Sequence, residues 1–295
     1  MFETLKNVFR VKEMRRKLLY LIWMIFIIRI GCQIPVPGVD SDFFKQWFSS
    51  NAGDAFNFFD AFTGGSFERM SIFALNITPY ITSSIIIQLL TIAIPALEEM
   101  QRDGEEGRKK MTAITRYVTV GLALFESIAM AIGFGRQGMI PNLDFFKGVV
   151  VVACLTAGSA MLMWLGERIT EKGVGNGISI VLTINIISRV PSDLTLLYEN
   201  FIKGKTIAKG TLAGLIIAAV ILLVVVLVLI LNGAERRIPV QYSKKMVGRK
   251  LMGGQSTNIP LKVNTAGVIP VIFASSIMSF PAVIAQLTGK GNGTG

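Results

Sequence analysis

Long apolar runs alternate with short polar and charged segments along nearly the whole chain. A helix needs about 20 predominantly apolar residues to cross a bilayer. We predict seven such spans, at about 18–34, 71–95, 117–133, 146–165, 178–190, 212–231 and 266–287. A basic amphipathic helix at 1–17 is expected to lie at the membrane surface before the first span. The pattern therefore predicts an all-α polytopic membrane protein.

The second predicted span, 71–95, has a polar middle that a lipid-facing helix does not need. Pro79 lies in it and is expected to weaken the helix, because proline removes a backbone donor. At helical spacing, one stripe carries Ile77, Ile81, Ser84 and Gln88. Polar groups at membrane depth face protein or water rather than acyl chains. Two interpretations follow: a helix buried in a bundle, or a helix that lines a pathway and moves.

Composition supports the membrane class and argues against several kinds of catalytic site. Hydrophobic residues make up 52% of the 295 residues, histidine is absent, and the two cysteines, Cys32 and Cys154, lie in or beside apolar runs. These counts argue against a disulfide framework, a Cys/His metal site and a histidine-based catalytic triad. The glycine-rich stretch 173–177 follows no predicted strand, so it lacks the context of a nucleotide-binding loop. We predict that the protein is not an enzyme and holds no cofactor or metal.

The distribution of charge predicts the orientation in the membrane. The formal net charge is +11, with 30 Lys and Arg residues. If the amino terminus is cytoplasmic, twenty of these fall in cytoplasmic segments and nine in external ones, as the positive-inside rule requires. Arg29 and Glu126 are the charged residues that we single out within spans, and Arg29 is expected to snorkel or to pair inside the protein.

Six ordered motifs are spread over most of the chain. They are IPVPGVD, FTGGSFERMSIFAL, ITPYITSSIIIQLL, MWLGERITEKGVGNGISI, QSTNIPLKVNTAGVIPVIFASSI and SFPAVIA. Together these motifs resemble the bacterial SecY family, whose members form the central subunit of the SecYEG protein-conducting channel. The resemblance implies a ten-span subunit built as two inverted halves, hinged between spans 5 and 6, around an hourglass pore. Inverted repeats around a midplane site recur in membrane transport proteins.

The expected fold is therefore a SecY-type inverted-repeat helical bundle, truncated after span 7. The amphipathic helix at 1–17 is followed by a first half at 18–190, which includes an external plug at about 54–69. The second half begins in 191–295, with a cytoplasmic loop at 232–264. Spans 8 to 10, which in the family supply part of the pore ring and one wall of the gate, have no counterpart in these residues.

The resemblance also implies roles for four groups of residues. The pore ring is expected at Ile77, Ile81, Ile178, Leu182 and Ile272, with Leu182 in place of the family's usual isoleucine. The plug is expected to contact the ring through Phe56, Phe58, Phe59 and Phe62 and to hinge at Gly64 and Gly65. The lateral gate is expected at Gln88, Glu126, Ser275, Ser276 and Phe280. Docking of a ribosome or SecA is expected at Arg236, Arg237, Lys244, Lys245, Arg249 and Lys250, where Pro239 and Tyr242 suggest a bent hairpin.

Each group also has a simpler interpretation from the pattern alone. The isoleucines could be ordinary core or lipid-facing residues, and the plug an external loop with an aromatic patch. The polar gate residues could join helices without any motion. The basic loop could serve only the positive-inside rule and the binding of anionic lipid.

The predicted function is that of a channel subunit in the bacterial cytoplasmic (inner) membrane. It would pass unfolded preproteins across the membrane or release membrane proteins sideways into it. The implied partners are SecE, SecG, SecA or a ribosome, signal sequences, nascent chains and anionic lipid. Two alternatives stay open: a secondary transporter or ion channel, and a truncated SecY that is itself nascent cargo.

Overall fold

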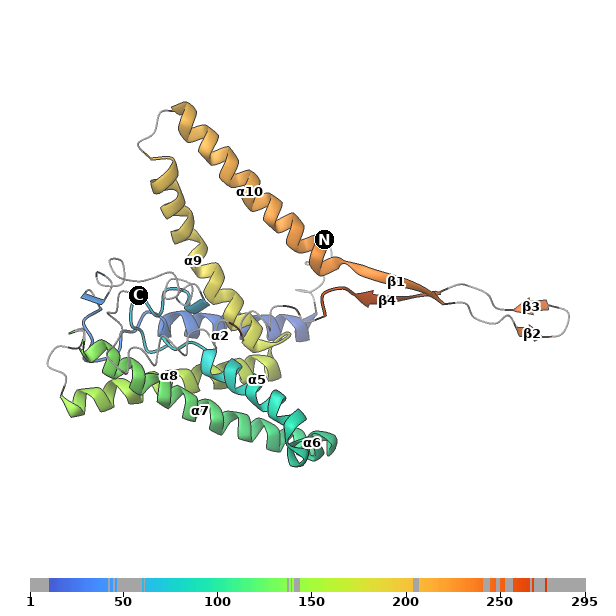
Figure 1. Cartoon of the computed structure of the whole chain (residues 1–295), viewed down its shortest axis with the longest axis horizontal. Helices are drawn as coiled ribbons and strands as arrows, with labels where there is room; N and C mark the ends of the chain where they lie inside the picture. The colour runs from blue at the N-terminus through green and yellow to red at the C-terminus, as the bar shows by residue number, and fades with distance from the viewer. Residues whose placement is uncertain are drawn as a thin grey trace. The chain divides into compact units, whose positions relative to one another are not determined.

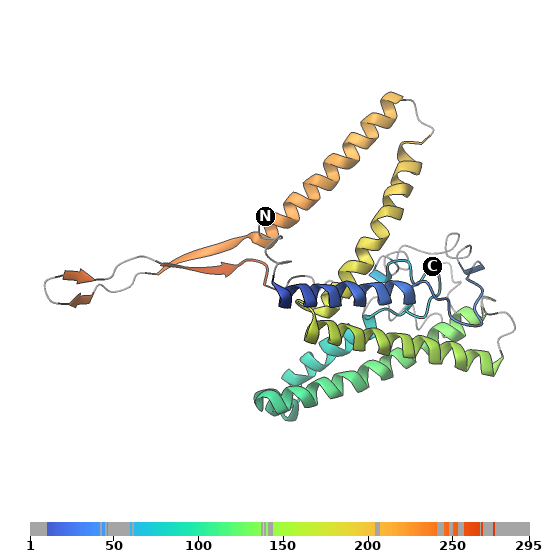
Figure 2. The ribbon, with the colours of Figure 1, turned by 180° about the vertical axis from the view of Figure 1, so that it is seen from behind.

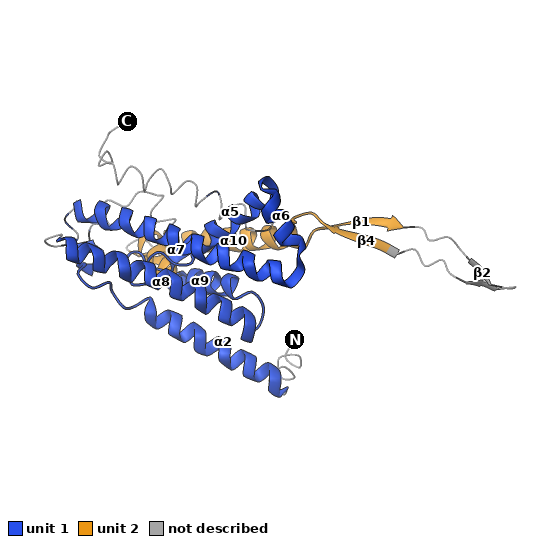
Figure 3. Ribbon diagram, turned by 90° about the horizontal axis from the view of Figure 1, so that it is seen from below, with its two compact units in different colours: residues 1–191, 273–295 blue, residues 192–272 orange. Residues whose placement is uncertain are grey.

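The chain is described here by a computed structural model (Figure 1). It describes residues 11–41, 43, 44, 46, 60, 62–136, 138, 140, 144–203, 207–240, 245–247, 250–252, 257–265, 267 and 274. The chain divides into two compact units, one of residues 1–191 and 273–295 and the other of residues 192–272, coloured separately in Figure 3.

The first unit is a bundle of helices that run along or across one another. Its elements are α2 (Lys12–Gly31), α5 (Thr78–Ala93), α6 (Pro95–Arg102), α7 (Gly104–Arg136), α8 (Phe145–Lys172) and the first part of α9 (Gly177–Phe201). α8 packs against both α7 and α2, and Figure 2 shows α2 lying along it. α8 begins where the side chain of Asp144 accepts a hydrogen bond from the Phe145 N–H, and it ends at Gly173.

Several helices are long and apolar enough to cross a membrane, as predicted. Within the described residues they are α7, α8, α9 and Lys209–Gly233 of α10, with α5 and α6 forming a further pair bent by 104°. α2 is not among them, because basic residues crowd its first two turns and Arg29 lies in its last turn. The predicted span at 266–287 lies almost wholly outside the described residues.

The helices extend beyond the predicted spans in three places. The charged stretch between the second and third spans is helical, because α6 and the start of α7 occupy it. α8 continues through 166–172, and α9 continues past Pro191 to Phe201. Pro79 does not weaken a helix interior: α5 begins at Thr78, so Pro79 lies in the first turn, where a missing N–H is tolerated.

Two apolar cores stabilise the first unit. In one, Phe44 and Phe134 meet edge to face with centroids 5.0 Å apart, and Phe67 joins them against buried residues of α7 and α8. In the other, Phe73 packs with Ile28 of α2 and with Leu162 and Leu165 of α8. Ile72 contacts both cores, so the stretch before α5 connects them.

The second unit contains α10 (Ile207–Gly233) and four short strands. β1 (Glu235–Val240) pairs antiparallel with β4 (Thr257–Lys262), and β2 (Lys245–Val247) pairs with β3 (Lys250–Met252). The basic loop, where a bent hairpin was predicted, forms an antiparallel ribbon, but Pro239 lies within β1 opposite Asn258 rather than at a bend. Within the described residues these strands are the departure from an all-helical fold.

Candidate functional site

A buried, largely non-helical stretch leads into α5. We call it the irregular segment, and it comprises Asp60 and residues 62–77. Most of its residues are buried, including Phe67, Met70, Leu75 and Ile77. Its backbone groups are paired by turns and by two bonds to the chain after α2, Val36 N to Met70 O and Ile72 N to Ile34 O, both 3.0 Å. Non-helical backbone at membrane depth is tolerated only where protein or a water-filled cavity surrounds it, and here protein does.

The irregular segment lies close against α8 because α8 presents glycines to it. A Cβ atom at Gly158 would lie 2.0 Å from the Ile72 carbonyl oxygen, so no larger residue fits without movement. A Cβ atom at Gly166 would lie 3.3 Å from Ile77 Cδ1 and 3.4 Å from Ile178 Cγ1. Two of the predicted ring residues, from different elements, therefore converge on Gly166.

The predicted ring residues differ in burial. Ile77 is fully buried, whereas Ile81, Ile178 and Leu182 are half-buried. Ile178 follows Gly177, whose position allows α9 to approach the Gly166 carbonyl of α8 closely. Ile272 lies outside the described residues.

Of the predicted plug residues, Phe62, Gly64 and Gly65 are described, while Phe56, Phe58 and Phe59 lie outside the described residues. Both glycines have positive φ, +68° and +81°, which glycine adopts without strain. Their surroundings differ. A Cβ at Gly64 would lie 2.5 Å from the Asn185 carbonyl oxygen of α9, whereas a Cβ at Gly65 would have no atom within 4 Å.

Polar side chains join the irregular segment to α9. Asp60 forms an ion pair with Arg189, and Asn76 accepts a hydrogen bond of 3.0 Å from Asn185 Nδ2. Arg29 of α2 donates to the Ser188 hydroxyl. The expected internal pairing of Arg29 is thus with a hydroxyl, while Arg29 itself stays half-buried.

The predicted gate residues are only partly described. Gln88 is exposed on α5 and Glu126 is half-buried on α7. Ser275, Ser276 and Phe280 lie outside the described residues. Ser83 of α5 donates to the Thr115 carbonyl of α7 at 2.9 Å, so a polar contact does join these two helices.

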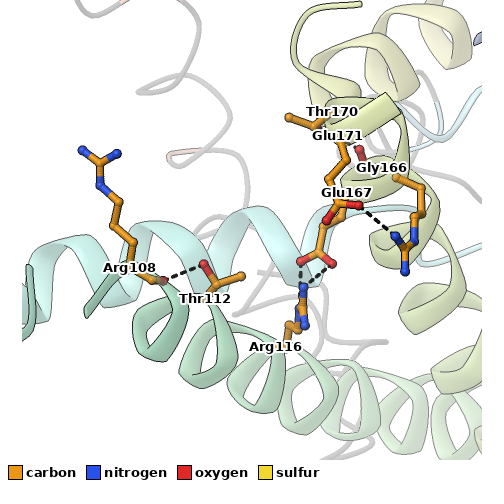
Figure 4. Close-up of polar contacts among 8 residues, drawn as sticks. Arg108, Thr112, Arg116, Gly166, Glu167, Thr170 and Glu171 are labelled. Atoms are coloured by element: carbon orange, nitrogen blue, oxygen red, sulfur yellow. Dashed lines mark hydrogen bonds and ion pairs between the residues drawn. The ribbon is translucent and has the colours of Figure 1, made fainter. Parts of the chain in front are cut away.

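An ion pair joins α7 to α8 near the charged end of both helices (Figure 4). Arg116 Nε lies 2.9 Å from Glu167 Oε1, and Arg116 Nη2 lies 2.8 Å from Glu167 Oε2. Figure 4 shows the guanidinium facing the carboxylate with both contacts. Such bidentate geometry is the favourable one for an arginine and a carboxylate.

The predicted docking residues lie on or beside the strands of the second unit. Arg236 and Arg237 are exposed on β1, opposite Leu261 and Pro260 of β4. Because successive side chains of a strand point to opposite faces, these two arginines lie on different faces of the ribbon. Lys245 begins β2 and Lys250 begins β3, while Lys244 and Arg249 lie outside the described residues.

The fold and the site define a class: a polytopic helical membrane protein in which an irregular segment is enclosed among the helices. The SecY family profile matches residues 71–294, and the chain belongs to the SecY family. "Protein translocase subunit SecY" of Halalkalibacterium halodurans is 44% identical over 298 residues, which cover 98% of this chain and 68% of that protein.

Solved structures show the same fold. One, described as showing that the plug domain of the SecY protein stabilises the closed state of the translocation channel, has a TM-score of 0.59 and 20% identity. The match covers 92% of this chain and 58% of that one. Another, the idle yeast Ssh1 complex bound to the yeast 80S ribosome, has a TM-score of 0.62 and 16% identity, over 95% and 60% of the two chains. The chain thus spans about three fifths of these solved chains.

Several residues that the structure brings together were not predicted from the sequence. Asp60 and Asn185 were not selected, and Arg189 was counted among external charges although it lies inside α9. One signal was available, because an asparagine and an arginine four residues apart in an apolar stretch share a helix face. The close approaches at Gly158 and Gly166 had no such signal, since their partners lie far away in sequence.

Proposed function

We propose that this chain is the channel-forming subunit of a protein translocase in the bacterial cytoplasmic membrane, with its amino terminus in the cytoplasm. It passes unfolded preproteins across the membrane or releases membrane proteins sideways, and it catalyses no chemical reaction. SecE and SecG assemble with it, a translating ribosome or SecA supplies the energy, and anionic lipid surrounds it. The observation that carries this proposal is the buried irregular segment ending at Ile77, beside Ile178, in a chain of the SecY family.

In this proposal the ring of Ile77, Ile81, Ile178, Leu182 and Ile272 closes the pore. Branched apolar side chains suit this role, because a narrow hydrophobic constriction loses water and resists the passage of ions. The plug includes Phe56, Phe58, Phe59, Phe62, Gly64 and Gly65 and moves away when a chain passes. The lateral gate comprises Gln88, Glu126, Ser275, Ser276 and Phe280. The helices that carry these residues can separate there without exposing much apolar surface to water.

Resting ion conductance of the complete channel in planar bilayers tests the ring. The double variant Ile81→Ser/Ile178→Ser changes two half-buried residues and is expected to raise conductance, because polar side chains keep the constriction wet. The matched control is Ile92→Ser/Ile187→Ser, on the same two helices, whose residues are 85% and 55% exposed. Equal conductance of the two variants would refute the ring assignment.

We further propose that the basic ribbon docks a ribosome or SecA through Arg236, Arg237, Lys244, Lys245, Arg249 and Lys250. The exposure of Arg236 and Arg237 on a two-stranded ribbon supports this proposal. Ribosomal RNA is a dense phosphate surface, and arginine binds phosphate in a bidentate manner.

Reversing the charge of the two exposed arginines distinguishes a docking role of the ribbon from a role in membrane topology alone. Arg236→Glu/Arg237→Glu is expected to weaken ribosome or SecA binding by about 10-fold or more, since charge-assisted contacts are the strong ones. Lys109→Glu/Lys110→Glu, at the exposed start of α7, is the matched reversal of cytoplasmic charge. If the arginine variant inserts normally and still binds both partners, the ribbon serves only as a topology signal.

A further inference from the structure

Polar contacts join the irregular segment to one turn of α9, residues 185–189. Asn185, Ser188 and Arg189 are spaced by three and four residues, so they lie on one face of α9 within a single turn. All three take part in polar contacts with the irregular segment or with α2.

The two carboxylate oxygens of Asp60 contact different parts of the protein. Oδ1 accepts hydrogen bonds from the Thr63 hydroxyl and the Glu68 N–H, both at 3.0 Å, and so holds its own turn. Oδ2 faces Arg189 of α9 in the ion pair. The Asp60 side chain is fully buried and that of Arg189 is 19% exposed. Removal of one partner from a buried pair leaves an uncompensated charge, which is strongly unfavourable.

Asn76 forms the second connection, at the other end of the irregular segment. Its φ of +53° places it in the left-handed region, which asparagine tolerates better than most residues. Its Nδ2 donates to the Phe62 carbonyl at 2.8 Å, and its Oδ1 accepts from Asn185 Nδ2. Both asparagines are buried, so Asn185 Nδ2 and Asn76 Oδ1 would each lose this partner if the segment moved away alone.

Gly64 allows the close approach that these contacts need. Its missing side chain leaves space for the Asn185 carbonyl and for the Ser188 hydroxyl, which a Cβ would meet at 2.5 and 2.9 Å. The Ser188 hydroxyl in turn donates to the Asn185 carbonyl at 2.7 Å and accepts from Arg29. The turn of α9 is therefore held in place by α2 on one side and contacts the segment on the other.

We propose that Asp60, Asn76, Asn185 and Arg189 form a latch that keeps the irregular segment closed against α9 until both of its contacts break together. This inference rests on the proposed channel function and identifies the positioning residues that set the threshold for opening. A rotation or shift of α9 by one turn releases the ion pair and the asparagine pair at once. Opening is therefore governed by α9, whose next turn towards its amino end carries the predicted ring residue Leu182.

Chemical labelling of the complete channel tests the latch. Ser66 lies in the irregular segment and is buried, so Ser66→Cys reports on opening when Cys32 and Cys154 are replaced by alanine. A membrane-impermeant maleimide is applied from the external side. Asp60→Asn keeps the Oδ1 contacts but removes the charge that faces Arg189, and Asn76→Gly keeps the left-handed backbone but removes the side chain. We expect each variant to raise the labelling rate by about 10-fold or more.

Three comparisons separate a latch from a purely structural role. Arg168→Gln, which removes an arginine from an exposed ion pair on α8, is expected to leave the labelling rate unchanged. Gly64→Ala is expected to raise labelling more than Gly65→Ala, because only a Cβ at Gly64 would meet α9. Arg189→Gln, which removes the charge from the α9 side of the same ion pair, is expected to raise labelling as Asp60→Asn does.

The latch is overturned if the Asp60→Asn and Asn76→Gly variants label at the rate of the parent channel. It is also overturned if they lower the midpoint of thermal unfolding while Ser66→Cys in the folded protein stays protected. Labelling does not depend on preprotein transport. A parent channel that transports no preprotein would thus refute the proposed function, while the labelling rates would still decide the latch.

Discussion

α8 and α10 are apolar helices of nearly equal length, 28 and 27 residues, yet they are used differently. About 39% of the most apolar window of α8 is buried, and its glycines meet the backbone and side chains of other elements. None of the corresponding window of α10 is buried, although α10 is the more apolar of the two. In a bilayer, lipid tails are as apolar as leucine, so apolarity alone does not drive helices together. Small residues and matched shapes decide which helix becomes the centre of a bundle.

The largest contrast is expected from a single methyl group placed on each helix. Gly158→Ala in α8 brings a Cβ within 2.0 Å of the Ile72 carbonyl and should destabilise the protein by about 1–3 kcal/mol or more. Gly214→Ala in α10 meets only Ile202 Cδ1 at 3.5 Å and should be neutral or stabilising by up to about 1 kcal/mol, since alanine favours helix. Thermal unfolding of the complete channel in detergent measures both effects.

Gly148→Ala is the control for this contrast, because it lies on α8 and a Cβ there would have no atom within 4 Å. It should behave like Gly214→Ala rather than like Gly158→Ala. Equal destabilisation by all three variants would mean that glycine itself, and not the close approach to Ile72, determines the effect.

Truncation of a leucine on each helix should give the next largest difference. Leu155 of α8 is fully buried, and Leu155→Ala should lower the free energy of unfolding by about 2–5 kcal/mol. Leu222 of α10 is 67% exposed, and Leu222→Ala should change it by only about 0.5 kcal/mol. Denaturation of the purified complex gives both values. A loss at Leu222 as large as that at Leu155 would show that another protein surface, rather than lipid, covers α10.

The smallest effect is expected at the ion pair that joins α8 to α7. Arg116 is about half exposed, so the pair should contribute only about 0.2–1 kcal/mol despite its bidentate geometry. A double-mutant cycle with Arg116→Gln and Glu167→Gln isolates this coupling, and 1 M salt should reduce it. A coupling of several kcal/mol would mean that lipid headgroups or a partner shield the pair from water. α10 carries no acidic or basic residue after Lys209, so it offers no comparable contact.

The buried ion pair on α9 shows what sequence patterns miss. Arg29 and Glu126 were recognised because an isolated charge in an apolar run is conspicuous. Arg189 was counted as an external charge because it lies at the end of the predicted span 178–190, yet α9 continues to Phe201. Pro191 lies inside α9, which shows that a proline is a probable helix boundary rather than a certain one. Asp60 lay within the predicted plug at about 54–69, but its burial and its partner Arg189 could not be read from local composition.

The sequence by itself determined the membrane class, the approximate positions of most spans and the family, because these depend on local apolarity and on ordered motifs. It also indicated a hairpin in the basic loop, although Pro239, which suggested the bend, lies within β1. Only the tertiary structure decided that α5 begins at Thr78, that Gly158 and Gly166 receive the irregular segment, and that Asp60 and Asn76 both reach one turn of α9. The physical reason is the sequence separation of the interacting residues. Hydrophobic periodicity is set by neighbours within a few residues, whereas Asp60 and Arg189, the most distant of these pairs, are 129 residues apart. Such contacts also depend on how closely two backbones approach, which a local pattern does not show.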